Sequence, residues 1–447
     1  MRPIFLSTIL LVVLLTSCRK NDAGSGGGSE ADKIKDTSIS YARDIYLWYD
    51  QIPSSFKARS YSDPNKIMEA IRAYSKEPGF ANPVDRWSFA TKKVDWDNTS
   101  SGIAKDFGLN IFFRTDNDLR VRLVEPLSPA GLAGVKRGWR ITKINGNTNI
   151  TAGNADFIVD AVYLSSTVSL TFQKPDGNSV DLNFTEASYQ SKSIYGDYVF
   201  DLGASKVGYL VYNSFLGDSA TTIDGFAATF NRFSSESVND VIVDLRYNGG
   251  GYVSYQQALA NYLVPASGNG GLMMKQEFND KYNQYNSSVN FSKKGNLNLS
   301  RLFVIVSNNT ASASELLINN LKPYMNVIVV GPQRTYGKPV GYFDIPVGDW
   351  YIFPVSTRTT NKNGEGNYFD GFALNHTVAD GIDKDFGDPA ESALASVLKY
   401  IGTGSFRIPV VDEAPPLSEE AKSANKKMSE HDFKGMLMNR VPGMQLQ

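Results

Sequence analysis

The sequence contains very little cysteine and histidine, and it has no long run of basic residues. Its single thiol means that disulfide bonds cannot hold the fold together. Histidine occurs only at His376 and His431, which weakens the case for a Ser-His-Asp triad or a histidine-rich metal site. The net charge is −1, and the absence of a basic block argues against nucleic acid as a partner.

The composition is that of a globular protein with more than one core. Of the 447 residues, 42% are hydrophobic and 20% are charged. A chain of this length predicts two or three domains. No segment beyond the N-terminal stretch is apolar enough to cross a bilayer.

The N-terminal stretch carries the only cysteine, Cys18. A short basic start precedes an apolar run from Ile9 to Leu15, which is too short to span a membrane as a mature helix. The run ends in "LTSC", which resembles the bacterial lipoprotein signal, in which the peptide is cut before a cysteine that is then lipidated. The alternative is an ordinary secretion signal with an incidental cysteine. We expect a signal peptide over 1–17 and a lipid anchor on Cys18 in the bacterial cell envelope, either on the outer membrane or facing the periplasm.

After Cys18, the residues of 18–35 include "AGSGGGSE", which predicts a flexible tether. The next region, 36–97, is predicted to be helical. In "ISYARDIYLWYDQI", apolar residues recur at helical spacing, and "SDPNKIMEAIRAYSK" begins with a cap-like Ser62 or Asp63 before Pro64. We interpret the aromatic residues of this region as core.

From 98 to 190 the period changes to two, which predicts a small β-rich domain. Within it, "SPAGLAGVKRGWRITKINGN" looks like part of a PDZ domain. The expected binding site is a loop of backbone N–H donors for a peptide carboxylate, beside a strand edge that accepts an extended peptide. The alternative is a β domain that binds nothing. The predicted carboxylate-binding loop consists of Phe107, Gly108, Leu109 and Asn110.

Strands and helices alternate from 191 to 404, which predicts an α/β domain with a mainly parallel, buried sheet. Strand-like runs such as "RLFVIV" and "NVIVVG" are continuous in apolar residues. The last segment, 405–447, is polar and contains prolines, so we expect a loose tail with a short helix near 429–439.

Small hydroxyl side chains gather in "SNNTASASELLINNL" (307–321), between a predicted strand and a helix. One of them could simply cap the helix, with Glu315 helping in the first turn. A cap does not explain the alternating alanines at 311 and 313, which leave room for a close approach. A nucleophile at a helix start also benefits from the amides there, because they stabilise an oxyanion.

A serine nucleophile needs a base, and lysine is the available candidate. Lys338 follows the strand "NVIVVG" in the run "RTYGKPVG", an apolar setting that favours the neutral amine. Neighbouring parallel strands bring their carboxyl ends to one edge of the sheet, where "DLRYNGGG" (244–251) also ends. Taken alone, Lys338 is an ordinary surface lysine and the glycines are an ordinary turn.

These three stretches together resemble the C-terminal processing peptidases, also called tail-specific proteases, which are serine endopeptidases with a Ser-Lys dyad and a PDZ domain. The resemblance covers roughly 85 to 400 and rests on "DLRYNGGG", "TASASE" and "TYGK". It implies a ClpP/crotonase-like catalytic domain, protein or peptide substrates, and no metal or organic cofactor. By position, Ser312 is the nucleophile, Lys338 is the general base, and Thr310 and Ser314 are supporting hydroxyls. The amides of Ala313 and Gly250 form the oxyanion hole.

Two features depart from the family pattern. The spacing from Ser312 to Lys338 is one residue longer than usual, with the extra residue in the loop "GPQRTYGK". Many members carry a glutamine four positions after the lysine, where this chain has Tyr342, whose phenol is able to hydrogen-bond an amine. The alternative function is therefore a catalytically weak or inactive relative that binds peptides or small apolar ligands.

Overall fold

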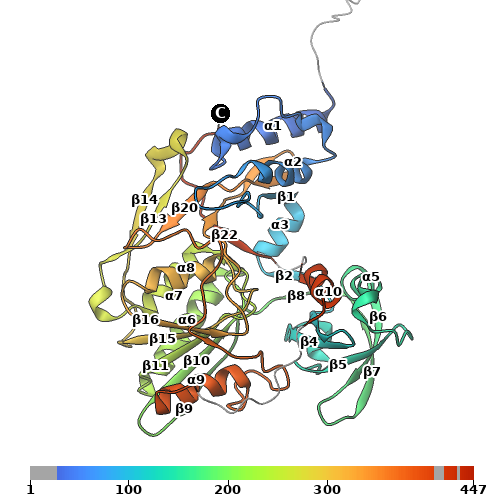
Figure 1. Cartoon of the computed structure of the whole chain (residues 1–447), viewed down its shortest axis with the longest axis vertical. Coiled ribbons are helices and arrows are strands. Elements are labelled where there is room, and N and C mark those ends of the chain that lie inside the picture. Colours follow the sequence, from blue (N-terminus) through green and yellow to red (C-terminus); the bar gives the residue numbers. More distant parts are fainter. Residues whose placement is uncertain (1–27, 407–416, 430–432, 447) are drawn as a thin grey trace, which may run out of the picture.

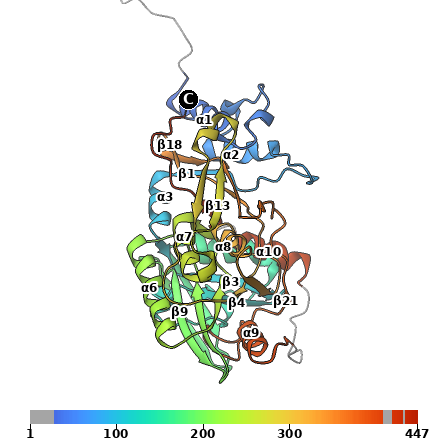
Figure 2. The same cartoon turned by 90° about the vertical axis from the view of Figure 1, so that its left-hand side faces the viewer.

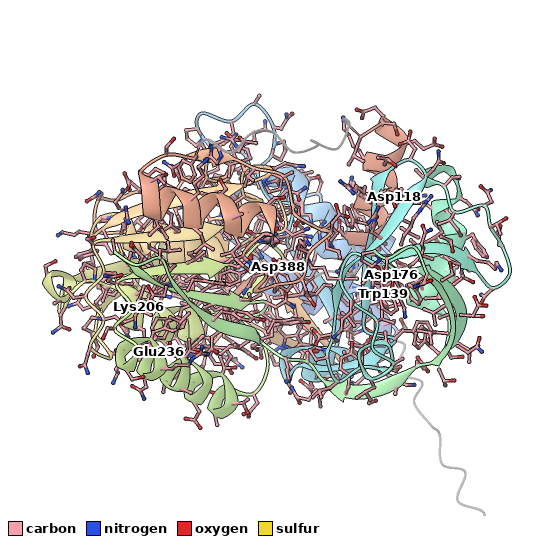
Figure 3. All side chains as sticks on the ribbon, turned by 90° about the horizontal axis from the view of Figure 1, so that it is seen from below. Asp118, Trp139, Asp176, Lys206, Glu236 and Asp388 are labelled. Carbon is pink, nitrogen blue, oxygen red and sulfur yellow. The ribbon has the colours of Figure 1, made fainter. Side chains whose placement is uncertain are left out.

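The computed structural model describes residues 28–406, 417–429 and 433–446. Figure 1 shows a large lobe, a smaller β-rich lobe beside it, and a helical region at one end of the large lobe. Seen from below in Figure 3, Lys206 and Glu236 lie on the large lobe, while Asp118, Trp139 and Asp176 lie on the β-rich lobe. Each lobe has its own hydrophobic core, and the two lobes contact each other along one side.

The N-terminal region contains three helices: α1 (Glu30–Ile45), α2 (Pro64–Ile71) and α3 (Lys93–Ser100). The predicted start for α2 is confirmed, because the side chain of Asp63 accepts a hydrogen bond from the amide of Lys66 at 3.0 Å. The predicted tether is too long, because α1 begins inside the range 18–35 that was expected to be flexible. Ser29 accepts from the amide of Asp32 and fixes that start. The aromatic side chains of the region pack in a core, as predicted.

The β-rich lobe, residues 103–190, is built on one antiparallel sheet of strand order β3-β4-β5-β6-β7. The strand β3 therefore lies at the edge of its sheet. The elements of the lobe are β2 (Ile103–Asp106), β3 (Leu109–Thr115), β4 (Asp118–Val124), α4 (Pro129–Leu132), β5 (Arg140–Ile144), α5 (Ala155–Val159), β6 (Thr167–Gln173), β7 (Ser179–Thr185) and β8 (Ala187–Gln190). Alternate residues of β3, β4 and β6 are buried, which is the expected pattern for a sheet with one covered face.

The large lobe is built on a six-stranded sheet of order β21-β16-β15-β11-β10-β9, in which only β9 runs antiparallel. The predicted mainly parallel α/β domain is thus present. Helices α6, α7 and α8 cover one face and α9 covers the other (Figures 1 and 2). The bounds are β9 (Ile194–Asp201), β10 (Lys206–Tyr212), α6 (Ser219–Ser235), β11 (Asp240–Asp244), α7 (Val253–Leu263), β15 (Arg301–Ile305), α8 (Ala313–Leu321), β16 (Asn326–Gly331), β21 (His376–Thr377) and α9 (Ser392–Thr403).

Smaller sheets connect the large lobe to the helical region. One has the order β1-β19-β18 and another the order β14-β13-β20-β17. Their bounds are β1 (Phe89–Lys92), β13 (Leu272–Glu277), β14 (Ser287–Asn290), β17 (Val340–Gly341), β18 (Ile345–Val347), β19 (Trp350–Phe353) and β20 (Thr357–Thr360). The strands β1, β17, β18 and β19 share one hydrophobic core with α1 and α2, so the helical region is packed onto the large lobe.

The last described part of the chain is ordered differently from the expected tail. It forms the helix α10 (Glu419–Ser429) and the strand β22 (Gly435–Leu437), which pairs in parallel with β12 (Gly250–Tyr252). The predicted helix near 429–439 is wrong, because residues 435–437 are a strand. The error has a physical reason: glycine and backbone pairing with β12 override the local helical preference of the methionine-rich run.

No helix in the described ranges has both the length and the apolar character to cross a membrane. The predicted signal peptide and Cys18 lie outside the described residues.

Candidate active site

Ser312 occupies the position just before α8, where the chain leaves β15 and turns into the helix. Its backbone has φ 60° and ψ −112°, a conformation that costs a non-glycine residue about 1–3 kcal/mol. The side chain is fully buried, and its Oγ has no hydrogen-bond partner among the described residues. Strain and an unpaired buried hydroxyl are both unfavourable, so their presence together points to a functional serine rather than a cap.

The carboxylate of Glu315 joins the backbone of Ser312 to that of Lys338. One oxygen, Oε2, accepts from the amide of Ser312 at 2.9 Å and from the amide of Lys338 at 2.8 Å. The other oxygen accepts from the amide of Gly337 at 2.7 Å and from the hydroxyl of Thr335 at 2.6 Å. Burial raises the pKa of Glu315, although these hydrogen bonds oppose the rise. The backbone amides of the two residues predicted to form a dyad are therefore bound by the same carboxylate oxygen.

Lys338 is fully buried, and burial lowers the pKa of its ammonium well below the ordinary value, with a smaller opposing effect from Asp85. The amine is thus disposed to be neutral, as a general base must be. Its Nζ donates to the carbonyl of Lys434 at 3.1 Å and lies 3.7 Å from the centre of the Tyr342 ring.

Tyr342 contacts the lysine with its ring face. The hydroxyl that we expected to bond the amine instead donates to the carbonyl of Lys434 at 3.2 Å. Tyr342 is 1% exposed, so the ring cannot turn away easily, and it restricts where the amine can lie. The predicted contact between the two residues is present, but through the aromatic face and not through a hydrogen bond.

The glycine loop after β11 lies against Ser312. A side chain at Gly250 would place its Cβ 2.9 Å from the Cβ of Ser312 and 2.3 Å from the carbonyl oxygen of Gly435, and φ is 103° there. Only glycine fits these constraints. The amide of Gly250, predicted as an oxyanion donor, donates to Oδ1 of Asn248 at 2.9 Å. Ala313 stands at the first position of α8, where an amide has no partner within the helix.

The other hydroxyls of the Ser/Thr stretch support the glycine loop. Thr310 donates to the carbonyl of Leu245 at 2.7 Å, and Ser314 donates to the carbonyl of Asn248 at 3.0 Å. Ser307 donates to the carbonyl of Arg246. The abundance of serine and threonine at this helix start therefore has a structural cause, since each hydroxyl other than that of Ser312 binds a loop carbonyl.

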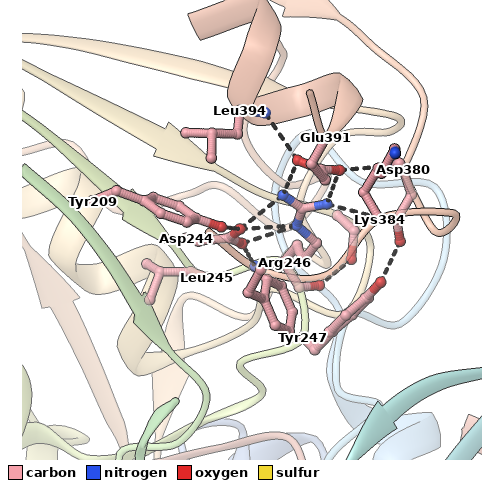
Figure 4. Close-up of polar contacts among 12 residues, drawn as sticks. Tyr209, Asp244, Leu245, Arg246, Tyr247, Asp380, Lys384, Glu391 and Leu394 are labelled. Atoms are coloured by element: carbon pink, nitrogen blue, oxygen red, sulfur yellow. Dashed lines mark hydrogen bonds and ion pairs between the residues drawn. The ribbon is translucent and has the colours of Figure 1, made fainter. Parts of the chain in front are cut away.

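A buried ion network holds the start of the same loop (Figure 4). The guanidinium of Arg246 binds Asp244 and Glu391, each at 2.8 Å, and also Asp380 at 2.8 Å. Burial opposes ionisation of Glu391, but Arg246 outweighs it and lowers the pKa. Breaking one partner of such a buried network is costly, because it leaves an uncompensated charge.

The network also reaches the β-rich lobe. Arg137 of that lobe binds Asp380 at 2.6 Å and donates to the hydroxyl of Tyr247, which in turn donates to Asp380. Burial disfavours the charged form of Asp380, but Arg137 and Arg246 lower its pKa overall. The two lobes are therefore tied together directly beside the glycine loop.

A cleft of about 2080 Å³ separates these parts of the molecule. Its lining comes from both lobes and from the last part of the chain, and includes Phe113, Tyr336, Tyr342, Asn425, Phe433 and Lys434. The predicted nucleophile and base are fully buried behind this wall.

The predicted carboxylate-binding loop lies at the start of β3, beside a second pocket of about 610 Å³. Gly108 has φ 77°, as a tight loop requires, and its amide donates to Oδ1 of Asp106 at 2.6 Å. A carboxylate of the chain itself thus already binds this loop. Phe107 is buried, Leu109 belongs to β3, and Asn110 lines the second pocket.

Sequence reasoning missed the roles of Glu315, Asn248 and the Arg246 network. Glu315 was expected only to assist the first turn of α8. The letters of "DLRYNGGG" contain Asp244, Arg246 and Asn248, but their partners, such as Glu391, lie far away along the chain. His376 stacks on the ring of Phe406, and the structure gives it no part in the site. No group of His, Cys, Asp or Glu in the described part of the chain could hold a metal ion.

Comparison with known proteins identifies the family. Residues 206–374 match Peptidase family S41, and residues 34–89 match the Peptidase S41 N-terminal domain. The carboxy-terminal processing protease CtpB of Bacillus subtilis (strain 168) is 27% identical over 260 residues, which cover 57% of this chain and 50% of that protein. CtpA of the same organism is 22% identical over 321 residues, covering 71% of this chain and 62% of that protein.

A crystal structure gives the same result at the level of the fold. A protein of Bacteroides fragilis NCTC 9343 assigned to the S41 proteases superposes with a TM-score of 0.67 at 25% identity, covering 83% of this chain and 97% of that one. The fold is that of an S41 peptidase, a family in which the named relatives are processing proteases. The chain belongs to peptidase family S41 and carries both the N-terminal domain and the peptidase domain of that family. It spans 50% and 62% of the lengths of the two Bacillus relatives.

Proposed function

We propose that the chain is a serine endopeptidase in which Ser312 and Lys338 act as a catalytic dyad. The proposal is supported above all by the shared contact with Glu315, whose Oε2 binds the amides of both residues. The lowered pKa of Lys338 supplies a base and the unpaired Oγ of Ser312 supplies a nucleophile, and both side chains are buried.

In the proposed reaction, Ser312 Oγ gives its proton to the neutral Nζ of Lys338 and attacks the carbonyl carbon of a peptide bond. The negative charge that develops on the carbonyl oxygen is stabilised by the amide of Ala313 at the start of α8. Gly250 supplies a second amide if Asn248 releases it. The leaving amine takes the proton from Lys338, and water then hydrolyses the acyl-enzyme with the same lysine as base.

We further propose a PDZ-like role for the β-rich lobe and a ClpP/crotonase-like character for the large lobe. The strand β3 lies at a sheet edge, and an edge can accept an extended peptide as one more strand. The loop at Phe107–Asn110 would then bind the end of a substrate chain. No metal or organic cofactor enters this reaction.

The envelope location is a separate proposal that rests on the sequence of the N-terminal stretch. Lipidation of Cys18 would attach the chain to a bacterial membrane, with a glycine-rich tether before α1. Metabolic labelling with an alkyne fatty acid tests it: the unaltered chain takes up label and Cys18→Ser does not. Equal label on both chains contradicts the anchor.

Acyl-enzyme mapping tests the catalytic proposal. The chain is mixed with an activated peptide ester, acid-quenched and digested, and the adduct is located by mass spectrometry. We expect the adduct on Ser312, its loss in Ser312→Ala, and its retention in the matched control Ser314→Ala, whose hydroxyl only supports the loop. An adduct that persists in Ser312→Ala, or no adduct in any chain, contradicts the proposal and favours the peptide-binding alternative.

A further inference from the structure

The helix α10 covers the free edge of the β-rich lobe. The side-chain amide of Asn425 forms both hydrogen bonds that a neighbouring strand would form with Phe113 of β3. It accepts from the amide of Phe113 at 2.7 Å and donates to its carbonyl at 2.9 Å. The core of the same lobe includes the side chains of Ala421, Ala424 and Met428. An extended peptide therefore cannot pair with β3 at Phe113 while α10 is in place.

The strand β22 covers the catalytic residues in the same way. It runs parallel to β12, and the amide of Gly435 donates to the carbonyl of Gly249 at 2.9 Å. On its other side, the amide of Tyr342 donates to the carbonyl of Met436 at 3.0 Å, and the amide of Met438 donates to the carbonyl of Tyr342 at 2.9 Å. Backbone groups make all of these bonds, so any extended peptide could reproduce them.

The carbonyl groups of this strand lie where a substrate carbonyl would have to come. That of Lys434 accepts from Nζ of Lys338, and that of Gly435 lies close to Gly250, which itself lies against Ser312. Ser312 and Lys338 are both 0% exposed. A scissile carbonyl must approach the nucleophile to about 3–3.5 Å, and the strand leaves no path for it.

We propose that residues 418–429 and 433–438, here called the occluding segment, are an internal occupant of both peptide grooves, and that a substrate binds by displacing them. The identity of the displacing ligand as a peptide substrate rests on the proposed peptidase function. The segment then indicates the preferred substrate: an extended chain parallel to β12, with a small residue facing Gly250 and a long apolar side chain in the slot of Met436. Val253, Met274 and Leu316 line that slot, in which Met436 is fully buried.

A thiol placed at the nucleophile position reports on the occluding segment independently of catalysis. In the chain with Cys18→Ser, which has no other cysteine, Ser312→Cys carries the only thiol. Met436→Asp is added to expel β22, because a carboxylate is strongly disfavoured in an apolar slot. The matched control is Asn439→Ala, which changes an exposed residue directly after the occluding segment.

We expect Met436→Asp to increase the rate of maleimide labelling at least tenfold, and Asn439→Ala to leave it unchanged. A synthetic peptide of residues 433–444 should slow the labelling again, whereas the same peptide with aspartate at position 436 should not. The proposal is overturned if labelling of the Met436→Asp variant stays slow, or if that variant is unfolded and the peptide does not restore its fold. In either case β22 is an ordinary structural strand.

Hydrogen exchange of the unaltered chain tests the proposal without any substitution. The amides of Phe113, Gly435 and Met438 should exchange together, at least tenfold faster than that of Val304 in the central strand β15. Exchange of all four amides at one slow rate overturns the proposal. If labelling and exchange behave as expected but no variant cleaves a protein substrate, the peptidase proposal fails while the occluding segment stands.

Discussion

Replacing Glu315 by glutamine perturbs the site at the atom that joins the two catalytic candidates. The carboxylate accepts four hydrogen bonds, two at each oxygen. A glutamine keeps its shape but offers one oxygen and one NH₂ group. The best fit keeps the oxygen on the amides of Ser312 and Lys338 and turns the NH₂ toward Thr335 and Gly337.

In that arrangement the hydroxyl of Thr335 can accept, but the amide of Gly337 faces another donor. A buried donor left without an acceptor costs about 1–3 kcal/mol, and the remaining bonds lose their charge. The site can relieve this cost only by shifting the backbone of Ser312 or Lys338. Since 1.4 kcal/mol is a factor of ten, a misalignment of the dyad worth the same free energy lowers kcat/KM by about 5- to 150-fold. Burial raises the pKa of Glu315, so a neutral side chain also removes a desolvation cost. Stability should therefore fall less than activity.

The assay is the initial rate of cleavage of an unfolded protein, with urea unfolding measured in parallel. Glu30→Gln is the control, because its carboxylate is exposed and forms an ion pair with Lys33 on the surface of α1. The loss should lie in kcat, with KM nearly unchanged. Equal kcat/KM for Glu315→Gln and Glu30→Gln would refute the positioning argument.

Three further predictions concern the base, the glycine loop and the ion network. Burial lowers the pKa of Lys338, so activity should fall as pH decreases through that lowered value. Lys338→Met should raise the free energy of unfolding at pH 7, and this gain should disappear as pH approaches 10.5. An equal gain at both pH values in urea unfolding contradicts this. Gly250→Ala should cost more stability than Gly146→Ala by thermal unfolding, because both have positive φ but a Cβ at Gly146 meets nothing within 4 Å; equal losses would show that the contacts of Gly250 do not matter. Burial raises the pKa of Asp380, but Arg137 and Arg246 lower it overall, so their stabilisation of the fold is present above the ordinary carboxylate pKa of 3.8 and is lost as pH falls through the lowered value. Arg137→Met should therefore move the midpoint of acid unfolding, followed by tryptophan fluorescence, to higher pH. An unchanged midpoint argues against the network.

Local patterns predicted the elements of the large lobe well. Continuous apolar runs became the parallel strands β15 and β16, and the predicted helix after the Ser/Thr stretch is present as α8. Buried parallel strands have a strong signal in sequence, because both faces of the sheet are covered. The three short motifs meet at one edge of the sheet, as strand order requires.

Long-range contacts were beyond the reach of these patterns. The strand β22 is set by pairing with β12, almost two hundred residues earlier in the chain, and its own residues gave no period-two signal. Asp380 and Glu391, the distant carboxylate partners of Arg246, likewise depend on tertiary packing. The sequence also could not show that the amides of Gly108 and Gly250 bind side chains of the chain itself.

The cleavage of an unfolded protein by matched variants tests the central claim most directly. Initial rates are compared for the unaltered chain, Ser312→Ala and Lys338→Ala, each also with Met436→Asp to release the occluding segment. The account predicts cleavage by the chains that keep both residues, and a loss of at least about a thousandfold in every chain that lacks either one. Cleavage that continues unchanged without Ser312 or without Lys338 would contradict it.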